Sequence, residues 1–281
     1  MKVSIIIPTF NEAEVIGDCL QSLLKQTYQD LEIIIVDDGS NDNSKLKIQN
    51  SKLDFEYQNF LFLEQEHKGA GAARNLGAKY AKGEILVFVD ADMTFDKDFV
   101  KKLVDPIIKG KSKGTFSKEE YVSNWENIWA KCWSINEGWA EKRRHPKNYA
   151  NKQKVFRAIL RKEFIKVNGF TPGGYNDDWS LSDKLGYLAT EAKGARFYHK
   201  NPSSISEIFQ HAKWVGKREY KLGFFGKIFA IFRSLLPFSI LIGFYKFILT
   251  GEPLFVIFKI IYDFSLFIGI LELILLGKKA K

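Results

Sequence analysis

Residues 85–92 read Ile-Leu-Val-Phe-Val-Asp-Ala-Asp, a run of five apolar residues that ends in two carboxylates. The run lacks the alternation of a strand with one wet face, so it predicts a strand covered on both faces, as in a parallel sheet between helical layers. Asp90 and Asp92 then lie at its carboxyl end, and extended backbone points both side chains the same way. Two such carboxylates repel each other unless a cation lies between them, and Mg2+ and Mn2+ take oxygen ligands of this kind. A surface turn with helix-capping aspartates is the alternative.

Three further apolar runs precede this strand, and helix signals follow each of them. The runs are residues 2–8, 31–36 and 60–63. Asn11 is expected to cap the first helix, and residues 72–80 belong to the helix after the third run. The alternation of strand and helix predicts an α/β fold with a doubly wound, mainly parallel sheet. Such a sheet binds ligands beyond the carboxyl ends of its strands.

The composition narrows the class of protein. The 281-residue chain has a formal net charge of +9, which suits nucleic acid, anionic lipid or phosphorylated substrates. No RNA or DNA motif accompanies the charge, and many basic residues flank apolar segments, so membrane and phosphate are favoured. Cys19 and Cys132 lack CxxC spacing, which argues against a disulfide scaffold or a zinc site. The first residues show no signal-peptide pattern, so the folded domain is expected in the cytoplasm.

Four motifs resemble, in sequence and in order, those of the inverting family 2 glycosyltransferases. They are Ser-Ile-Ile-Ile-Pro-Thr-Phe-Asn-Glu at 4–12, Val-Asp-Asp-Gly-Ser at 36–40, Gly-Ala-Ala-Arg-Asn-Leu-Gly at 71–77 and Asp-Ala-Asp at 90–92. Members of this family have a GT-A fold. The chain resembles in particular the archaeal and bacterial mannosyltransferases of lipid-linked glycans and the catalytic core of cellulose-synthase-like enzymes. The resemblance implies a GT-A catalytic domain over residues 1–202.

The resemblance also implies which residues bind the nucleotide-sugar donor. They are Pro8, Thr9, Asn11, Glu12, Asp38, Arg74, Asp90, Ala91 and Asp92. The 8–12 loop and Asp38 are expected to hold the base and ribose, and Arg74 to line the edge of the donor pocket. A solvated helix face is the alternative for Arg74. Asp90 and Asp92 are expected to bind the donor and a divalent metal, Mn2+ or Mg2+, with Asp92 as the usual direct ligand.

Residues 173–185 resemble the family's Gly-Gly-Phe loop and Glu-Asp-x-Asp-Leu helix start. Asp177 and Asp178 stand where Glu-Asp is usual, and Ser180 replaces the later Asp. By position Asp178 is the candidate general base, which takes the acceptor hydroxyl's proton in a single displacement at the anomeric carbon. Asp177 and Trp179 are assigned to the acceptor or diphosphate side. Helix capping is the alternative for both aspartates, and an acceptor that is already an ionised phosphate requires no base.

Two further residues are candidates for the same edge. Arg157 interrupts a predicted strand at 155–160, and a buried arginine needs an anion, either the donor diphosphate or an internal carboxylate. His199 follows the last predicted strand, 195–199. It is either structural or, with Asp90 and Asp92, a ligand of the metal.

Residues 210–214 resemble the Gln-x-x-Arg-Trp element that membrane-embedded polysaccharide synthases place at the bilayer interface. Lys213 stands in for the arginine, which keeps the charge but loses bidentate pairing. Gln210, Lys213 and Trp214 are therefore candidates for acceptor or diphosphate binding. They belong to an amphipathic interfacial helix expected over 203–225.

A tryptophan stripe lies between the two halves of the chain. Trp125, Trp129 and Trp133 are spaced to share one face of a helix from about 117 to 143. Packing of this face against the sheet and contact with a membrane surface or the acceptor groove both remain open.

The remaining region, 226–281, contains two apolar segments, 228–250 and 254–276, each of 23 residues. As helices they would extend about 34 Å, enough to cross a hydrocarbon core of roughly 30 Å. Lys259 and Asp263, four residues apart in the second, are placed to pair. Basic residues on both flanks predict a transmembrane hairpin with both ends in the cytoplasm. A pair of interfacial helices is the alternative.

These features predict a membrane-anchored, metal-dependent inverting glycosyltransferase. Its donor would be a GDP- or UDP-linked hexose, mannose or glucose, and its acceptor a lipid-linked (polyprenyl or dolichyl) glycan, with no nucleic-acid partner. A polyprenyl-phosphate hexose synthase, with a phosphate as acceptor, is the rival within the class. The departures at Ser180 and Lys213 also permit a non-catalytic membrane scaffold that binds nucleotide. A dehydrogenase is disfavoured, because Pro-Thr-Phe-Asn follows the first strand instead of GxGxxG.

Overall fold

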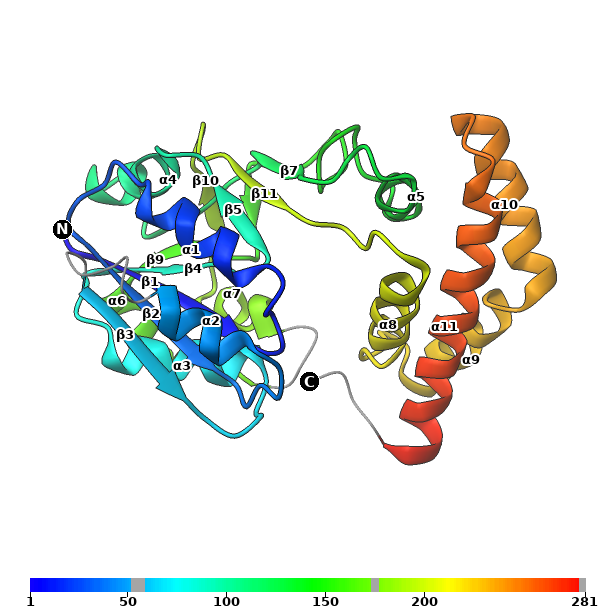
Figure 1. Cartoon of the computed structure of the whole chain (residues 1–281), viewed down its shortest axis with the longest axis horizontal. Helices are drawn as coiled ribbons and strands as arrows, with labels where there is room; N and C mark the ends of the chain where they lie inside the picture. The colour runs from blue at the N-terminus through cyan, green and yellow to red at the C-terminus, as the bar shows by residue number, and fades with distance from the viewer. Residues whose placement is uncertain (52–58, 173–176, 278–281) are drawn as a thin grey trace. The chain divides into compact units, whose positions relative to one another are not determined.

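A computed structural model describes residues 1–51, 59–172 and 177–277 (Figure 1). It divides into two compact units, of which the first comprises Met1–Tyr121 and Asn148–His199. The second comprises Val122–Lys147 and Lys200–Lys281. Each unit has its own core and is described by itself.

Unit 1 is built on an eight-stranded mixed sheet with the order β3-β2-β1-β4-β9-β6-β10-β8. The strands are β1 (Val3–Thr9), β2 (Leu31–Asp37), β3 (Asn59–Glu64), β4 (Ile85–Phe88), β6 (Gly114–Phe116), β8 (Lys152–Gln153), β9 (Ala158–Leu160) and β10 (Ala189–Glu191). The first four are parallel, as the alternation of strand and helix predicts. β9 inserts antiparallel between β4 and β6, and β8 is antiparallel to β10. The second half of the sheet is therefore mixed.

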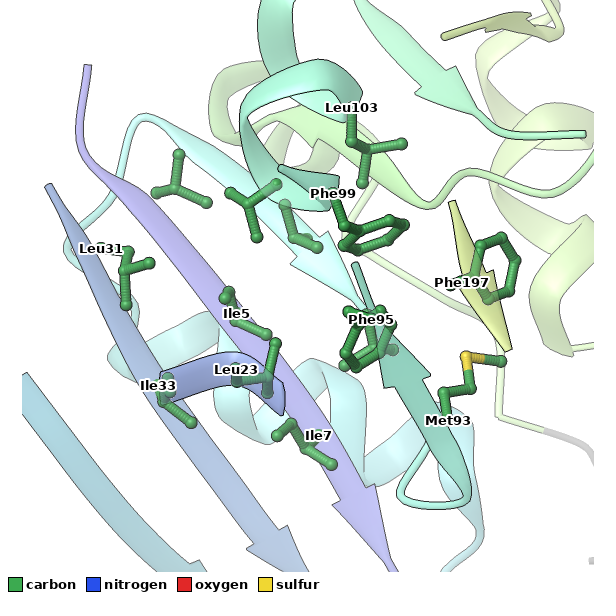
Figure 2. Close-up of a cluster of buried hydrophobic side chains, with 14 of the residues drawn as sticks. Ile5, Ile7, Leu23, Leu31, Ile33, Met93, Phe95, Phe99, Leu103 and Phe197 are labelled. Atoms are coloured by element: carbon green, nitrogen blue, oxygen red, sulfur yellow. The ribbon is translucent and has the colours of Figure 1, made fainter. Parts of the chain in front are cut away.

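The central strands are covered on both faces, which confirms the reading of the apolar run at 85–89. Ile5 and Ile7 of β1 belong to one buried cluster, whereas Ile6 belongs to another on the opposite face. The first cluster packs under α1 (Ile16–Leu24), α2 (Ser44–Ser51) and α4 (Phe99–Ile108). The second packs under α3 (Ala70–Tyr80), α6 (Arg161–Lys166) and α7 (Ser180–Leu185). Figure 2 shows the first cluster, where Leu23 of α1 and Phe99 of α4 meet the strand side chains.

A small second sheet has the order β5-β11-β7. Its strands are β5 (Met93–Phe95), β7 (Glu120–Val122) and β11 (Phe197–His199). β11 is antiparallel to β5, with His199 opposite Met93. This register brings His199 beside the chain that has just left the Asp90–Asp92 turn, although the two segments are far apart in sequence.

Two sequence-based expectations about the helices are wrong. Asn11 does not cap α1, because the helix begins at Ile16 after Val15, and Asn11 takes the left-handed backbone conformation (φ 56°) that asparagine tolerates. The single helix over about 117–143 is also absent from the described chain. β7 and a turn occupy its first part, and only α5 (Ile128–Glu137) is helical, capped by the side chain of Asn127.

Unit 2 consists of helices α5, α8 (Ile205–Gly216), α9 (Gly223–Arg233), α10 (Leu236–Thr250) and α11 (Leu254–Leu276). Trp133 of α5 is buried edge-on against Phe258 and Tyr262 of α11. Trp133 therefore packs within a helical core, whereas Trp125 lies outside α5. Where α8 crosses α11, a Cβ on Gly269 would lie 2.0 Å from the carbonyl oxygen of Lys213, so only glycine permits this approach.

α11 is, within the described residues, the one helix that is by itself long and apolar enough to cross a membrane. The predicted first span, 228–250, is not one straight helix, because α9 and α10 are bent by 69° at a break after Arg233. Pro237 lies in the first turn of α10, where it suits a helix start and lacks the N–H that a continuous helix needs. The predicted pairing of Lys259 with Asp263 is confirmed at 2.7 Å.

Candidate active site

Asp90 lies two residues beyond β4 and is bound by two arginines. Arg74, on α3, donates from Nη2 to Asp90 Oδ1 at 2.7 Å, and Arg157, just before β9, donates from Nη1 to Oδ2 at 3.2 Å. Burial by itself raises the pKa of the Asp90 carboxyl, but the guanidiniums of Arg74 and Arg157 outweigh burial and hold the pKa well below its ordinary value. Of the two anions expected for Arg157, the structure thus shows the internal carboxylate.

Arg74 also binds Asp178, which connects α3 to the short 3-10 helix η2 (Asp177–Trp179). The guanidinium therefore bridges two carboxylates, while its buried Nε has no hydrogen-bond partner among the described residues. Arg74 is buried and not on a solvated helix face. Asp178 keeps 39% of its side-chain surface exposed, and its Oδ2 makes no hydrogen bond within the described residues.

The neighbouring Asp177 has a different environment. Its carboxylate is buried, and its Oδ2 accepts a hydrogen bond from the backbone N–H of Gly71 at 3.1 Å, in the first turn of α3. A Cβ at position 71 would lie 2.4 Å from this oxygen. Helix capping, the alternative role for Asp177, therefore agrees with this hydrogen bond. The helix that Asp177 caps is α3, and not the helix that follows it in sequence. Trp179 is exposed, with the Lys154 ammonium 5.8 Å from the centre of its ring.

Asp92 points to the second sheet. Its Oδ2 lies 2.7 Å from Nε2 of His199, and Nδ1 of the same ring lies 3.1 Å from Oε1 of Glu120. The histidine is thus oriented between two carboxylates. Glu12 belongs to the same electrostatic environment, because burial first, and then the charges of Asp92 and Asp90, raise the pKa of its carboxyl to about 8.

Few side chains around Asp90 and Asp92 are available to bind a divalent metal. The described residues contain no group of three or more His, Cys, Asp or Glu side chains placed to hold a metal ion. Both oxygens of Asp90 already accept from arginine, which leaves Asp92 and His199 as the adjacent pair. Mg2+ is often held by one or two carboxylates together with substrate phosphates, and imidazole is a common ligand of transition metals. Burial is the main cause of the raised pKa of Glu12, and a cation would offset the smaller contribution from the charges of Asp92 and Asp90. The pair therefore fits an ion that is shared with a diphosphate.

The loop after β1 is fastened to the loop after β2. The backbone N–H of Asn41 donates to Asn11 Oδ1 at 2.9 Å, and the N–H of Asn11 donates to Ser40 Oγ at 2.9 Å. Pro8 and Thr9 remain in β1, opposite Val36 and Asp37. The buried Oγ1 of Thr9 has no hydrogen-bond partner within the described chain, so a polar group is free at this position.

Asp38 is buried and organises the loop that leads into α3. Its carboxylate accepts from the backbone N–H groups of Lys68 and Gly69, both at 2.8 Å, and Oδ2 lies 2.9 Å from His67 Nδ1. The His67 ring in turn stacks on Phe10, with 4.1 Å between ring centres. The two rings and the Asp38 carboxylate therefore form one connected group at the carboxyl edge of the sheet.

Sequence reasoning did not assign site positions to His67, Phe10 or Glu120. Phe10 lies inside the first motif, next to Asn11, which the resemblance assigns to the donor-binding loop at 8–12. His67 contacts Phe10, and Glu120 contacts His199. Both contacts join segments that are distant in sequence, so the spacing of neighbouring residues could not predict them.

The three candidates in unit 2 lie on α8. Lys213 is ion-paired with Glu272 of α11, with 2.6 Å between Nζ and Oε1. Gln210 and Trp214 are exposed on the same helix. The ion pair gives Lys213 a role within the helical unit, and the charge that the sequence assigned to a diphosphate is balanced by Glu272.

The sequence matches the model of glycosyl transferase family 2 over residues 4–167. The chain belongs to glycosyl transferase family 2. One relative of this family 2 chain is UDP-Glc:alpha-D-GlcNAc-diphosphoundecaprenol beta-1,3-glucosyltransferase WfgD of Escherichia coli. The two sequences are 32% identical over 123 residues, and the aligned part covers 43% of this chain and 47% of WfgD. The chain spans less than half the length of the curated relatives it matches.

Two solved structures share the fold of this family 2 chain. S. aureus TarS in complex with UDP-GlcNAc has a TM-score of 0.57 at 20% identity, covering 77% of this chain and 66% of that chain. Mannosyltransferase PcManGT from Pyrobaculum calidifontis, in complex with GDP-Man and Mn2+, has a TM-score of 0.55 at 21% identity, covering 94% of this chain and 73% of that chain. These neighbours support the GT-A-like α/β fold that the sequence predicts.

Proposed function

We propose that this chain is an inverting glycosyltransferase that moves a hexose from a GDP- or UDP-linked sugar to an acceptor hydroxyl. The observation that carries the proposal is the chain of contacts from Asp90 through Arg74 to Asp178 at the carboxyl edge of the sheet. It places a partly exposed carboxylate beside a buried guanidinium, and Asp92, which contacts His199, lies two residues beyond Asp90. Family membership and the fold support the same class of reaction.

The nucleotide-sugar donor binds, in this proposal, between the carboxyl ends of β1 and β2 on one side and Arg74 on the other. Thr9 Oγ1 and Arg74 Nε are buried polar atoms without described partners, and each suits an oxygen of a nucleotide sugar. The stacked rings of Phe10 and His67 offer an aromatic face next to Asp38 for the base. Pro8, Asn11, Glu12 and Ala91 complete the donor-binding set that the family motifs imply.

In the transfer step, Asp178 takes the proton of the acceptor hydroxyl as the new bond forms at the anomeric carbon and the bond to the diphosphate breaks. Oδ1 is held by Arg74, so Oδ2 is the oxygen that receives the proton. A Mn2+ or Mg2+ ion held by Asp92 and His199 would neutralise charge on the departing diphosphate. Arg74 and Arg157 keep Asp90 ionised and fix the orientation of the turn that carries Asp92.

The proposed acceptor is a lipid-linked glycan at the cytoplasmic face of a membrane. WfgD acts, by its name, on a diphosphoundecaprenol-linked sugar. Large apolar side chains are exposed on α9, α10 and α11, including Phe225, Ile248 and Leu275, each more than 70% exposed. Apolar surface on this scale favours insertion into lipid. Membrane fractions washed with carbonate should retain the protein, whereas release into the wash would contradict anchoring.

The test is sugar transfer by the full chain from labelled UDP- and GDP-hexoses, with Mn2+, to diphosphopolyprenyl-linked sugars and to polyprenyl phosphate. Asp178→Asn should lower kcat by about a hundredfold or more on a hydroxyl acceptor, the range of general-base contributions. Asp183→Asn is the matched control, because Asp183 lies on the adjacent helix and pairs with the exposed Lys154. Full activity of Asp178→Asn on polyprenyl phosphate would favour the rival synthase, whose acceptor needs no base. No transfer with any donor would favour the nucleotide-binding scaffold.

A further inference from the structure

Unit 2 contains a cavity of about 410 Å³, and none of the residues that line it is among the candidate site residues named above. It is lined by the end of α5, the segment before α9, α9 itself and the middle of α11. Four of its lining residues are cationic and two are carboxylates. These are Arg218, Lys221, Arg233 and Lys259, with Glu137 and Asp263. The cavity therefore carries an excess of positive charge and suits an anion.

A buried ion pair forms part of the wall. Lys259 and Asp263 are 7% and 5% exposed on the apolar helix α11, where ionised groups are costly and are usually kept for a function. Asp263 Oδ2 accepts from Ser239 Oγ at 2.8 Å, so the carboxylate is satisfied on both oxygens. Lys259 donates to Asp263 at 2.7 Å and to Asn136 at 3.3 Å. An ammonium group has three N–H donors, so one is not used by these two bonds; the centre of the Tyr262 ring, which also lines the cavity, lies 5.2 Å from Nζ.

Two of the cations have no internal partner. Lys221 and Arg233 make no ion pair or hydrogen bond through their side chains within residues 1–51, 59–172 and 177–277, and both are exposed. Both side chains line the same cavity as the Lys259 ammonium, so an anion bound there would be attracted by all three cations. Arg233 offers a planar fork of donors that matches a phosphate.

The cavity also has apolar walls that continue onto an apolar surface. Leu222 and Phe229 line it and are 74% and 66% exposed, and Phe225 and Phe232 of α9 are exposed as well. A small inorganic anion would not contact this apolar surface. An amphiphile would place its phosphate among the cations and its hydrocarbon chain along Leu222 and Phe229.

We propose that this cavity binds the phosphate head group of a lipid, with Lys259, Lys221 and Arg233 as its phosphate contacts. Every residue of the proposed site belongs to the helical unit. Its ligand class is a phosphate ester carried by a hydrocarbon chain, which distinguishes it from a general attraction of basic residues to an anionic bilayer.

The test measures binding of dioctanoyl phosphatidic acid to the full-length protein in neutral detergent by calorimetry. Dioctanoylglycerol supplies the same chains without the phosphate, and inorganic phosphate supplies the anion without the chains. The cavity variant is Lys221→Gln with Arg233→Gln. The control variant is Lys227→Gln with Lys246→Gln, which removes the same charge from α9 and α10 outside the cavity.

We expect phosphatidic acid to bind the wild type and the control alike. The cavity variant lacks two of the proposed phosphate contacts and should bind about tenfold or more weakly, since tenfold is already the effect of losing one charge-assisted contact. The exposed positions of both cavity substitutions should leave the melting temperature unchanged, so the comparison reports binding. Equal weakening in both double variants would overturn the proposal in favour of diffuse charge. Binding of dioctanoylglycerol or of inorganic phosphate as tight as that of phosphatidic acid would overturn it as well, since either result removes the need for a lipid phosphate.

Discussion

Arg74 on α3 and Asp90 beyond β4 are joined by a hydrogen bond of 2.7 Å in the buried edge of the sheet. The same guanidinium binds Asp178, so one side chain holds two carboxylates that come from separate parts of the chain. A buried arginine with two anionic partners is stabilised where an isolated one would be costly. The geometry of the proposed site therefore depends on this bridge.

Replacing Arg74 with lysine should remove most of the transferase activity. A lysine ammonium is a single point charge and cannot span both carboxylates as a planar fork does. The loss of a charge-assisted contact is worth about 1.5–3 kcal/mol, or about ten- to a hundredfold in kcat/KM. Arg196→Lys is the control, because Arg196 is half exposed and pairs with Asp96 away from the bridge. Equal kcat/KM in the two variants would show that bridging by Arg74 does not contribute to catalysis.

Asp92→Asn should raise the Mn2+ concentration required for half-maximal activity by about tenfold or more, since it removes one of two proposed protein ligands. Glu120→Gln should produce a smaller change in the same direction, because Glu120 orients the ring of His199. Mn2+ binding followed by electron paramagnetic resonance, with nucleoside diphosphate present, checks the effect without turnover. Asp96→Asn serves as the unaffected control, and unchanged Mn2+ binding in Asp92→Asn would remove Asp92 from the metal site.

Gly77→Ala should lower the melting temperature, because an added Cβ would lie 2.6 Å from Ile6 Cγ2 where α3 packs on β1. Overpacking of this kind typically costs about 1–3 kcal/mol. Gly17→Ala, in the first turn of α1, is the matched control with no heavy atom within 4 Å of the added Cβ. It should be neutral or stabilising by up to about 1 kcal/mol, because alanine is the better helix former. Melting curves of both variants measure the difference.

Glu32 should contribute a pH-dependent part of the stability. Burial by itself raises the pKa of its carboxyl, but hydrogen bonds from Ser4 Oγ and the Lys82 N–H outweigh this and lower the pKa below the ordinary 4.5. The stabilisation is therefore fully present above about pH 4.5 and is lost as the pH falls through the lower folded-state pKa. Glu32→Gln should cost about 1–3 kcal/mol at pH 7. The gap in melting temperature between wild type and variant should narrow on acidification, and a constant gap would contradict the assignment.

Several features of the fold were predictable because their cause is local. The run at 85–89 has no polar face, so it had to be covered on both sides, and Leu86 and Val87 are buried against opposite clusters. Lys259 and Asp263 are one helical turn apart, and they pair as that spacing predicts. The helix at 254–276 follows from a predominantly apolar composition, and its bounds agree with α11.

Other predictions were wrong because a competing local signal or a contact with a distant segment determined the structure. Periodicity of Trp125, Trp129 and Trp133 favoured one long helix, but residues 120–122 pair in a sheet whose partner strand is at 197–199, and the helix begins only at Ile128. The segment at 228–250 has the composition of a membrane helix. Pro237 has no backbone N–H to donate within a continuous helix, and the segment bends between α9 and α10. In both places composition and periodicity alone did not show where the backbone hydrogen bonds go.

The sequence by itself determined the family, the parallel half of the sheet and the edge on which the carboxylates gather, because motifs and apolar runs are properties of neighbouring residues. Only the tertiary structure decided the partners. β9 inserts antiparallel beside β4 and brings Arg157 to Asp90, and β11 pairs with β5 and brings His199 to Asp92. Strand pairing between segments tens of residues apart is set by the whole core, since each strand must bury its apolar faces and complete its backbone hydrogen bonds at once.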